Sequence, residues 1–232
     1  HADSIAHGLA TRGFADVDSF LSSETVSAMR AEADCMRAAG FMRTSESTRW
    51  DAQLERAVAY DKHNVLFSPI QGGEMYEATP RLTEFCVALV GALPDALNSR
   101  VGSLQLSNKV HTNKLAVCLG DGSRYDKHID NMGGDDVRKV TAIVYLQDGW
   151  EPTHGGLFRA HLADGDVDLE PRGGRLLVFY ADSLVHSVLP SHAPRGEADA
   201  RWALTCWLHA ASVEQIRFDE AAERQHFGEV SG

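Results

Sequence analysis

The sequence lacks the features of a membrane protein, a zinc protein or a general nucleic-acid binder. No apolar run approaches the roughly 18 residues of a membrane-spanning helix. The four cysteines form no CxxC pair, which argues against a zinc site built from them. Acidic residues number 33 against 22 lysines and arginines, and a net charge of −11 repels phosphate. We therefore expect neither a membrane nor a nucleic acid as a partner.

The cysteines also indicate the compartment. Unpaired, scattered cysteines are typical of small core residues in a reducing environment. Those of this chain are Cys35, Cys86, Cys118 and Cys206. We therefore expect an intracellular protein, located in the cytoplasm or also in the nucleus.

Length and organisation indicate one domain. The 232 residues can bury a sizeable core, and the sequence shows no repeat and no low-complexity segment. We expect a single domain over residues 1–232, with a helical support at about 1–100. Helices are predicted at 4–13, at 23–40 and after Thr79-Pro80, because glycine ends the first, Ser22 can cap the second and proline suits a first turn.

The remaining segments of this front part are less regular, and the chain closes on a charged tail. Residues 14–17 are predicted to form a short strand. Residues 41–60 are polar and predicted to be irregular. Residues 212–227 have the pattern of a charged amphipathic helix.

Between about residues 110 and 210 the pattern is that of a β core. Short strand-like runs alternate there with Gly, Asp and Pro. The predicted strands are 113–119, 139–147, 156–161, 175–180, 187–190 and 201–209. Closely spaced strands after a helical front predict a mainly β fold, either a sandwich or a jelly roll with helices packed on one side.

Two histidines and an aspartate are candidate metal ligands. His128 and Asp130 alternate on an extended segment and can face one ion, and His186 follows an apolar strand. Two imidazoles and a carboxylate on one face of Fe(II) are typical of non-haem iron oxygenases. The HxD pair alone is weak evidence, because His1-Ala2-Asp3 repeats it and a lone histidine is usually a surface residue. By spacing alone, the competitors of His186 are His154, His161 and His192.

A candidate carboxylate pocket lies on the segment 201–207. Its β alternation places Arg201, Thr205 and Trp207 on one face. Burying an arginine is costly unless something pairs with its guanidinium, and the planar fork suits a carboxylate. Tyr145, on the predicted strand 139–147, could offer a second donor. A structural ion pair or an exposed edge strand remains the alternative at this point.

Several motifs occur in a fixed order between about residues 112 and 210. They are Tyr125-x-x-His128-x-Asp130-Asn131, Val140–Leu146, Gly155-Gly156-Leu157-Phe158-Arg159, Pro171–His186 and Arg201–Trp207. Together they resemble the 2-oxoglutarate- and Fe(II)-dependent prolyl 4-hydroxylases. The nearest likeness is to the intracellular type that includes the hypoxia-sensing HIF prolyl hydroxylases, and the first third of the chain matches only in its helices.

The resemblance implies a fold and an activity. The fold is a double-stranded β-helix, a cupin-like jelly roll, with supporting helices. The activity is that of a dioxygenase that hydroxylates C4 of a prolyl residue and releases succinate and CO2. A proline-containing protein is the implied partner, and we expect a monomer.

The resemblance also implies the ligands and the residues that hold them. Fe(II) would be held by His128, Asp130 and His186, and the co-substrate 2-oxoglutarate by Arg201, Tyr145 and Thr205. O2 is the oxidant, and ascorbate is a candidate accessory cofactor. Tyr125 and Trp207 would lie near the substrate, and a substrate-covering loop near residues 41–60 would include Arg49 and Trp50.

The chain departs from the family pattern at three places. A family tyrosine before the glycine turn is replaced at Cys118-Leu119, which removes a hydroxyl near the co-substrate. Residues 194–199 resemble an insertion and make Arg195 a competitor of Arg201 by spacing, although the strand pattern favours Arg201. The segment 41–60 does not copy the loop of the hypoxia sensors, so HIF itself is not a safe substrate prediction.

Two other functions stay open at this point. One is the same chemistry on a non-prolyl substrate, such as a small molecule or a nucleobase, although the acidic chain argues against the nucleobase. The other is a non-enzymatic jelly-roll binding module, against which the intact set of His128, Asp130, His186 and Arg201 argues.

Overall fold

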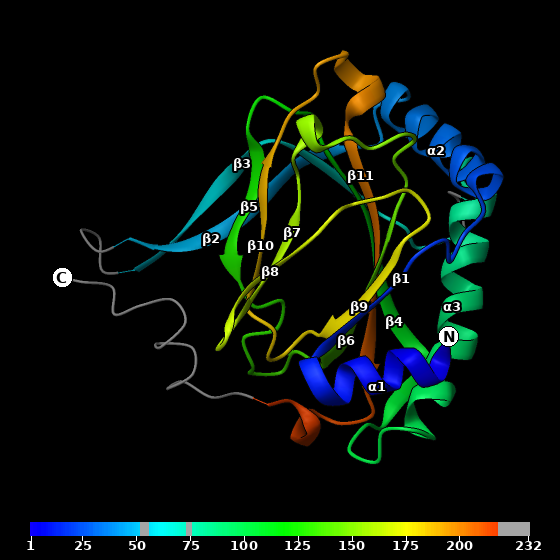
Figure 1. Cartoon of the computed structure of the whole chain (residues 1–232), viewed down its shortest axis with the longest axis vertical. Helices are drawn as coiled ribbons and strands as arrows, with labels where there is room; N and C mark the ends of the chain where they lie inside the picture. Colours follow the sequence, from blue (N-terminus) through cyan, green and yellow to red (C-terminus); the bar gives the residue numbers. More distant parts are fainter. Residues whose placement is uncertain (52–55, 73–75, 218–232) are drawn as a thin grey trace.

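Two antiparallel sheets face each other in this protein. In the computed structural model, the described residues are 1–51, 56–72 and 76–217, and the side chains of residues 48–57 are not among them. Within these residues the larger sheet has the order β1-β9-β6-β11-β4-β3-β2, and the smaller has the order β5-β10-β7-β8. Figure 1 shows the two sheets as separate layers.

The strands have the following bounds. The larger sheet contains β1 (Phe14–Val17), β9 (Leu176–Tyr180), β6 (Arg138–Tyr145), β11 (Arg201–Ala210), β4 (Leu106–Cys118), β3 (Arg56–Pro69) and β2 (Arg43–Asp51). The smaller sheet contains β5 (Ser123–His128), β10 (His186–Ser191), β7 (Phe158–Leu162) and β8 (Gly165–Leu169). From β4 to β11 the chain passes back and forth between the sheets, which is the path of a double-stranded β-helix. The predicted mainly β jelly roll is confirmed.

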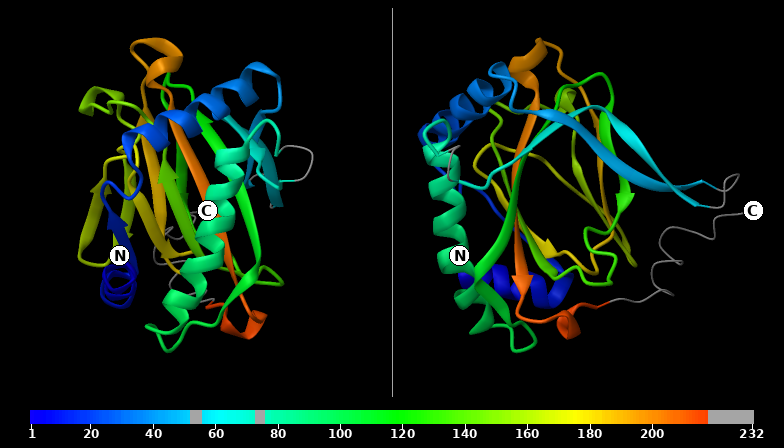
Figure 2. Two further views of the ribbon diagram at one scale, coloured as in Figure 1. Left: turned by 90° about the vertical axis from the view of Figure 1, so that its right-hand side faces the viewer. Right: turned by 180° about the vertical axis from the view of Figure 1, so that it is seen from behind.

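Three helices cover the outer face of the larger sheet (Figures 1 and 2). They are α1 (Ala2–Arg12), α2 (Ser23–Ala38) and α3 (Pro80–Asn98). Gly13 ends α1 at φ 78°, a conformation that glycine adopts without strain, and the Ser22 hydroxyl accepts the Thr25 N–H at the start of α2. These three predicted helices are confirmed. None of the described helices is long and apolar enough to span a membrane.

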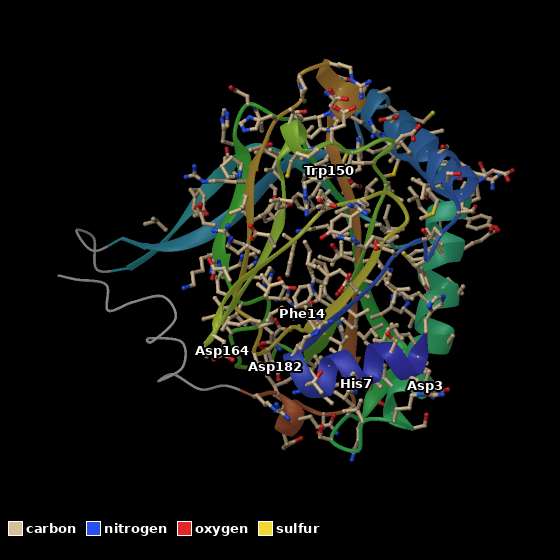
Figure 3. The ribbon with its side chains drawn as sticks, viewed as in Figure 1. Asp3, His7, Phe14, Trp150, Asp164 and Asp182 are labelled. Atoms are coloured by element: carbon tan, nitrogen blue, oxygen red, sulfur yellow. The ribbon has the colours of Figure 1, made fainter. Side chains whose placement is uncertain are left out.

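The larger sheet separates two apolar layers. One layer lies between this sheet and the helices, and it includes Trp202 and Leu204 of β11. The other lies between the two sheets, and it includes Phe158 and Phe179. Strand β11 is buried along almost its whole length because it serves both layers, with alternate side chains on opposite faces. Figure 3 shows side chains filling both layers, with Trp150 and Asp182 at opposite ends of the sandwich.

The prediction of an irregular segment at 41–60 was wrong. This segment belongs to a hairpin in which β2 pairs with β3. The hairpin extends past the sandwich (Figure 1). Its described side chains at 46–47 and 58–64 are exposed or half-buried and mostly polar, so apolar alternation was absent there. Strands β5 and β8 were also not predicted, for the same reason.

The predicted C-terminal helix lies largely outside the described residues. Its first residues, Val213–Gln215, form a short 3-10 helix. Residues 218–227 of that prediction are not described. The six predicted strands of the β core are confirmed with small shifts, and β4 begins seven residues earlier than expected, at Leu106.

A buried ion pair links the start of β6 to the turn that follows β9. The Lys139 Nζ lies 2.5 Å from the Asp182 Oδ2, and the two side chains are 3% and 0% exposed. The backbone carbonyl of Gln215 accepts a second hydrogen bond from Lys139, and the Arg217 N–H donates to Asp182. Both charged groups therefore have partners away from water.

Replacing Lys139 by Met should destabilise the fold strongly. The substitution leaves the Asp182 carboxylate buried without its cation, and such a loss costs about 3–5 kcal/mol. Urea unfolding followed by circular dichroism measures the free energy of unfolding. The double variant Lys139→Met with Asp182→Leu should regain much of the loss, and the exposed control Lys109→Met should stay within about 0.5 kcal/mol of the parent. A Lys139→Met variant as stable as the control would contradict the role of this pair.

Candidate metal centre and carboxylate pocket

His128, Asp130 and His186 come together between the two sheets. His128 ends β5 and His186 begins β10, and the two residues are directly opposite in the antiparallel pairing. Asp130 follows β5 in the next loop, so only His128 of the HxD pair lies in a strand. Asp130 Oδ1 lies 3.4 Å from His128 Nε2 and 3.7 Å from His186 Nε2. The potential ligand atoms all lie within 4.8 Å of one another, as a shared metal ion requires.

Both histidines present the same ring nitrogen to this point. The Nδ1 of His128 lies 2.8 Å from the carbonyl of Asp126, and the Nδ1 of His186 lies 3.0 Å from the carbonyl of Leu184. A carbonyl can only accept, so each Nδ1 carries the proton and donates it. In the neutral imidazole with this tautomer, Nε2 carries the free lone pair, which is the atom that binds a metal.

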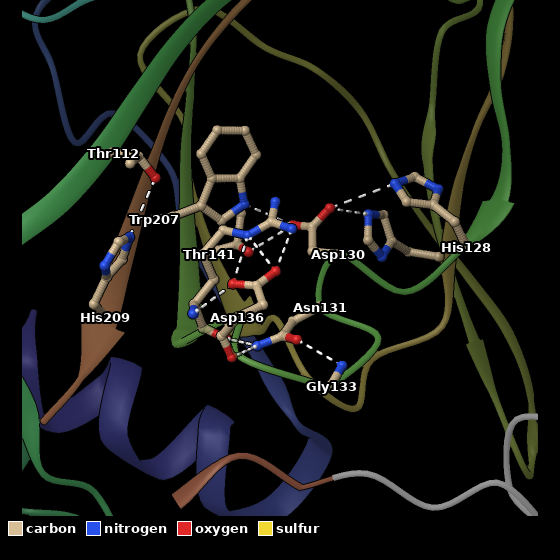
Figure 4. Close-up of polar contacts among 11 residues, drawn as sticks. Thr112, His128, Asp130, Asn131, Gly133, Asp136, Thr141, Trp207 and His209 are labelled. Atoms are coloured by element: carbon tan, nitrogen blue, oxygen red, sulfur yellow. Dashed lines mark hydrogen bonds and ion pairs between the residues drawn. The ribbon is translucent and has the colours of Figure 1, made fainter. Parts of the chain in front are cut away.

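Asp130 is fixed by two donors on the larger sheet. The Thr141 hydroxyl of β6 donates to Oδ2 at 2.6 Å, and the indole Nε1 of Trp207 on β11 donates to the same oxygen at 3.1 Å. Figure 4 shows Asp130 between His128 on one side and Thr141 and Trp207 on the other. Burial opposes ionisation of Asp130, but the two histidines and Thr141 outweigh it and hold the pKa of the carboxyl well below its usual range. Oδ1 is thus left as an ionised ligand oxygen.

His186 lies in an apolar setting. Its ring stacks on Phe158 at 5.1 Å between centroids and lies 4.7 Å from the ring of Phe179. Burial, together with the neighbouring His128, lowers the pKa of His186 to about 4. The imidazole is therefore neutral near pH 7, and a neutral imidazole is what a metal ion needs as a ligand.

Asn131 holds the loop that carries Asp130. Its side-chain amide donates to the carbonyls of Asp136 and Arg138 at 2.9 and 2.7 Å, and its side-chain oxygen accepts the N–H of Gly133 (Figure 4). Its own N–H donates to the carbonyl of Ala181, close to the start of β10. The loop is therefore tied to the segment that leads into His186.

Arg201 is a buried cation with room for an anion. The side chain belongs to a residue only 5% exposed, and its Nε donates to the Gly156 carbonyl at 2.7 Å. Among the described residues no carboxylate pairs with it. Its guanidinium lies over the Tyr145 ring at 5.0 Å, and the buried Tyr145 hydroxyl has no hydrogen-bond partner in the described part of the chain. A fork-shaped cation beside an unpaired hydroxyl fits a carboxylate ligand.

The Gly155-Gly156 pair is required by this packing. Gly156 has φ 68°, and a Cβ there would lie 2.8 Å from the Cδ of Arg201. A Cβ on Gly155 would lie 2.3 Å from the Pro190 carbonyl oxygen. No larger residue fits at either position without moving the backbone or Arg201.

One cavity of about 890 Å³ joins the two halves of the site. Its lining includes the three candidate metal ligands and Arg201. Tyr125, Thr205 and Trp207, predicted from the sequence, line it as well. The side chains of Arg49 and Trp50, predicted for the substrate pocket, lie outside the described residues, and their backbones pair with Val58 and Ala57 in the hairpin.

The competing residues have other partners. His154 lies 3.6 Å from Asp199, and Arg195 forms a closer pair with the same carboxylate. His161 contacts Asp166 and Ser187, while His192 is exposed. Of the described histidines, only His128 and His186 meet a carboxylate at the cavity as part of a three-ligand cluster.

Some residues and contacts of the site were not predicted from the sequence. Thr141 lies on the same face of β6 as Tyr145 by strand alternation, but this alternation does not predict its contact with Asp130. Cys118 was named in the sequence, but its contact was not predicted: it lies opposite Arg201 in the pairing of β4 with β11, with its thiol close to the guanidinium. Lys62 and Lys114 also line the cavity, and no sequence motif marked them.

Comparisons with known proteins agree with this geometry. A family model described as the 2OG-Fe(II) oxygenase superfamily matches residues 113–209. The human protein "Prolyl hydroxylase EGLN3" is 34% identical over 133 residues, which cover 55% of this chain and 52% of that protein. The chain thus spans about half the length of the curated relatives it matches.

Solved structures show the same fold. A Pseudomonas putida prolyl-4-hydroxylase is 28% identical with a TM-score of 0.74, covering 91% of this chain and 100% of that one. A Trichoplax adhaerens prolyl hydroxylase, solved with a peptide fragment of hypoxia inducible factor, is 24% identical with a TM-score of 0.75, covering 90% and 89%. The second likeness bears on the fold alone.

Replacing His186 by Ala should abolish Fe(II) binding at concentrations that saturate the parent protein, because two ligands cannot cap a face of the ion. Oxygen-free calorimetric titration with Fe(II) measures this. The exposed His7 on α1 offers a matched control, and His7→Ala should bind as the parent does. Equal binding by His186→Ala would rule out the proposed ligand set.

Replacing Thr141 by Val should weaken Fe(II) binding about tenfold or more without removing a ligand, because the substitution frees Asp130 to reorient. The control is Thr112→Val on β4, which is separated from β6 by β11 in the same sheet and whose hydroxyl contacts His209 instead (Figure 4). The same titration compares the two variants, and an unchanged affinity in Thr141→Val would show that the Asp130 contact has no positioning role.

Proposed function

We propose that this chain is a member of the 2-oxoglutarate- and Fe(II)-dependent oxygenase superfamily. In this proposal it hydroxylates C4 of prolyl residues in a protein substrate and releases succinate and CO2. The observation that carries the proposal is a single cavity with a candidate facial metal triad and a buried arginine that lacks a carboxylate partner among the described residues. The named activities of the human and Pseudomonas putida relatives support a prolyl substrate.

In this proposal each residue has a defined task. His128, Asp130 and His186 would hold Fe(II) by one face, and Fe(II) with 2-oxoglutarate and O2 supplies the oxidising chemistry when bound. Arg201 and Tyr145 would bind the remote carboxylate of 2-oxoglutarate, and Thr205 lines the same space. No side chain has to act as a general base, so the chain contributes geometry and charge rather than proton transfer.

The cavity walls would exclude water around the reacting centre. Phe158 and Val188 of the smaller sheet and Ile143 of the larger sheet are apolar lining residues. Tyr125 and Trp207 would lie against the substrate. An apolar wall limits the water that could compete with the target carbon and strengthens the charge interactions inside.

The proposal also covers organisation and setting. The chain would act as one dioxygenase domain over residues 1–232, in which the helical support packs against the β core through a shared apolar layer. A proline-containing protein would be its partner, and a monomer would suffice because the described ligands all come from one chain. The free cysteines support an intracellular location, such as the cytoplasm.

The activity can be tested directly. The protein is incubated with Fe(II), 2-oxoglutarate and proline-containing peptides, and succinate and hydroxyproline are measured by mass spectrometry. Succinate with a gain of one oxygen on proline is the expected result. If the peptides stay unmodified while another compound gains the oxygen, the enzyme acts on a different substrate. If no succinate forms under any condition, the protein is not a dioxygenase of this type.

Replacing Arg201 by Lys should raise the KM for 2-oxoglutarate about tenfold or more, because lysine keeps the charge but loses the bidentate fork and the Gly156 contact. Tyr145→Phe should raise it less, since it removes one neutral donor. Arg159→Lys on β7 of the smaller sheet, where Arg159 pairs with Asp168, is the matched control and should keep the parent KM. An unchanged KM in Arg201→Lys would place the co-substrate elsewhere.

A further inference from the structure

Two lysines line the cavity without an anionic partner among the described residues. Lys62 lies on β3 and Lys114 on β4, and both are half-buried. The Lys62 Nζ donates to the backbone carbonyl of Glu46 at 3.2 Å. No described carboxylate, including that of Glu46, lies within 4.0 Å of either ammonium group. Two cations therefore lie at the site without a described anion that neutralises them.

Aromatic rings hold these ammonium groups in place. The Lys62 Nζ lies 4.8 Å and the Lys114 Nζ 5.7 Å from the centroid of the same Tyr125 ring. Lys114 also lies 5.4 Å from the ring of Trp207 and 5.8 Å from that of Phe67. Ring faces attract a cation but carry no net charge, so they orient the lysines without neutralising them.

The two charges repel each other. Burial and the nearby Lys114 lower the pKa of Lys62 to about 8, and burial lowers the pKa of Lys114 as well. Asp130 opposes both shifts, but its oxygens are committed to Thr141, Trp207 and the two histidines. An anion that enters the cavity would relieve this repulsion.

Two other cations that line the cavity, Arg138 and Arg201, are assigned to other anions. Arg138 forms a two-pronged ion pair with Asp136, with its Nε 2.9 Å from Oδ2. Arg201 would take one carboxylate of 2-oxoglutarate and the metal ion the other. The co-substrate therefore supplies no further carboxylate for Lys62 and Lys114, which leaves the substrate as the source.

We propose that Lys62 and Lys114 form a subsite for an acidic side chain of the substrate, so that the enzyme selects proline residues with an aspartate or glutamate close by. The inference rests on the proposed prolyl hydroxylase function and names the class of protein it would modify. A carboxylate seated between the two ammonium groups would gain charge-assisted hydrogen bonds in a partly dry site.

Peptide pairs that differ only in Asp or Asn test this selectivity. One proline is kept, and the acidic residue or its amide is placed in turn at about three positions on either side. With the parent enzyme we expect kcat/KM to favour Asp over Asn about tenfold at one or more positions. In the double variant Lys62→Gln with Lys114→Gln, the Asp preference should fall below about twofold. It should fall partly in Lys62→Gln alone and persist in the control Lys109→Gln.

Two results would overturn the subsite. The first is the absence of an Asp preference at every position when the parent enzyme hydroxylates these peptides, or an Asp preference that is unchanged in the double variant. The second is a double variant in which the KM for 2-oxoglutarate rises while the Asp preference stays, because the lysines would then serve the co-substrate.

A binding measurement separates this inference from the proposed function. The Mn(II)-loaded protein is titrated calorimetrically with the same peptides under oxygen-free conditions, where no turnover occurs. Hydroxylated peptides without a lysine-dependent Asp preference in binding would overturn the subsite and leave the function standing. Lysine-dependent binding of Asp peptides without any hydroxyproline would remove the proposed function and support the acidic subsite.

Discussion

The two hydrogen bonds to Asp130 Oδ2 are the interaction on which the rest of the site depends. Thr141 and Trp207 fix one oxygen from the larger sheet, so that the other faces the two histidines on the smaller sheet. A carboxylate that rotated freely would not keep one oxygen directed at the two histidines. The sheets therefore meet at a point that is already shaped for three ligands, and a metal ion would find them arranged before it binds.

Charge organises the remainder of the cavity. Asp130 and Glu46 are acidic residues that line it, and they are outnumbered by cationic residues from several strands. The overall chain is acidic, with a net charge of −11, so the cavity has a sign opposite to that of the protein as a whole. The acidic surface would repel an anionic ligand at a distance, and the cavity would attract it only near the opening. The site therefore favours ligands that fit the cavity as well as carry negative charge.

The sequence predicted the parts of this molecule that have a periodic signal. Arg201, Thr205 and Trp207 share a face because strand side chains alternate, and that follows from spacing alone. The preference for His186 over His154 or His161 did not follow from spacing and came from the order of the motifs. The β2–β3 hairpin was missed because the described side chains at 46–47 and 58–64 are mostly polar and show no apolar alternation. Lys62 and Lys114 were missed because their meeting at Tyr125 depends on how separate strands assemble, which no local pattern records.

Strand β11 links correct assembly to a working site. A slip of one residue would turn Arg201 and Thr205 toward the helices and bring Trp202 and Leu204 to the cavity. A charged group would then lie in an apolar layer without a partner, so the slipped chain would be unstable as well as inactive. Proteases that degrade readily opened chains would remove such molecules without any signal from catalysis. Quality control in the cell would in this way select for active copies by their resistance to degradation alone.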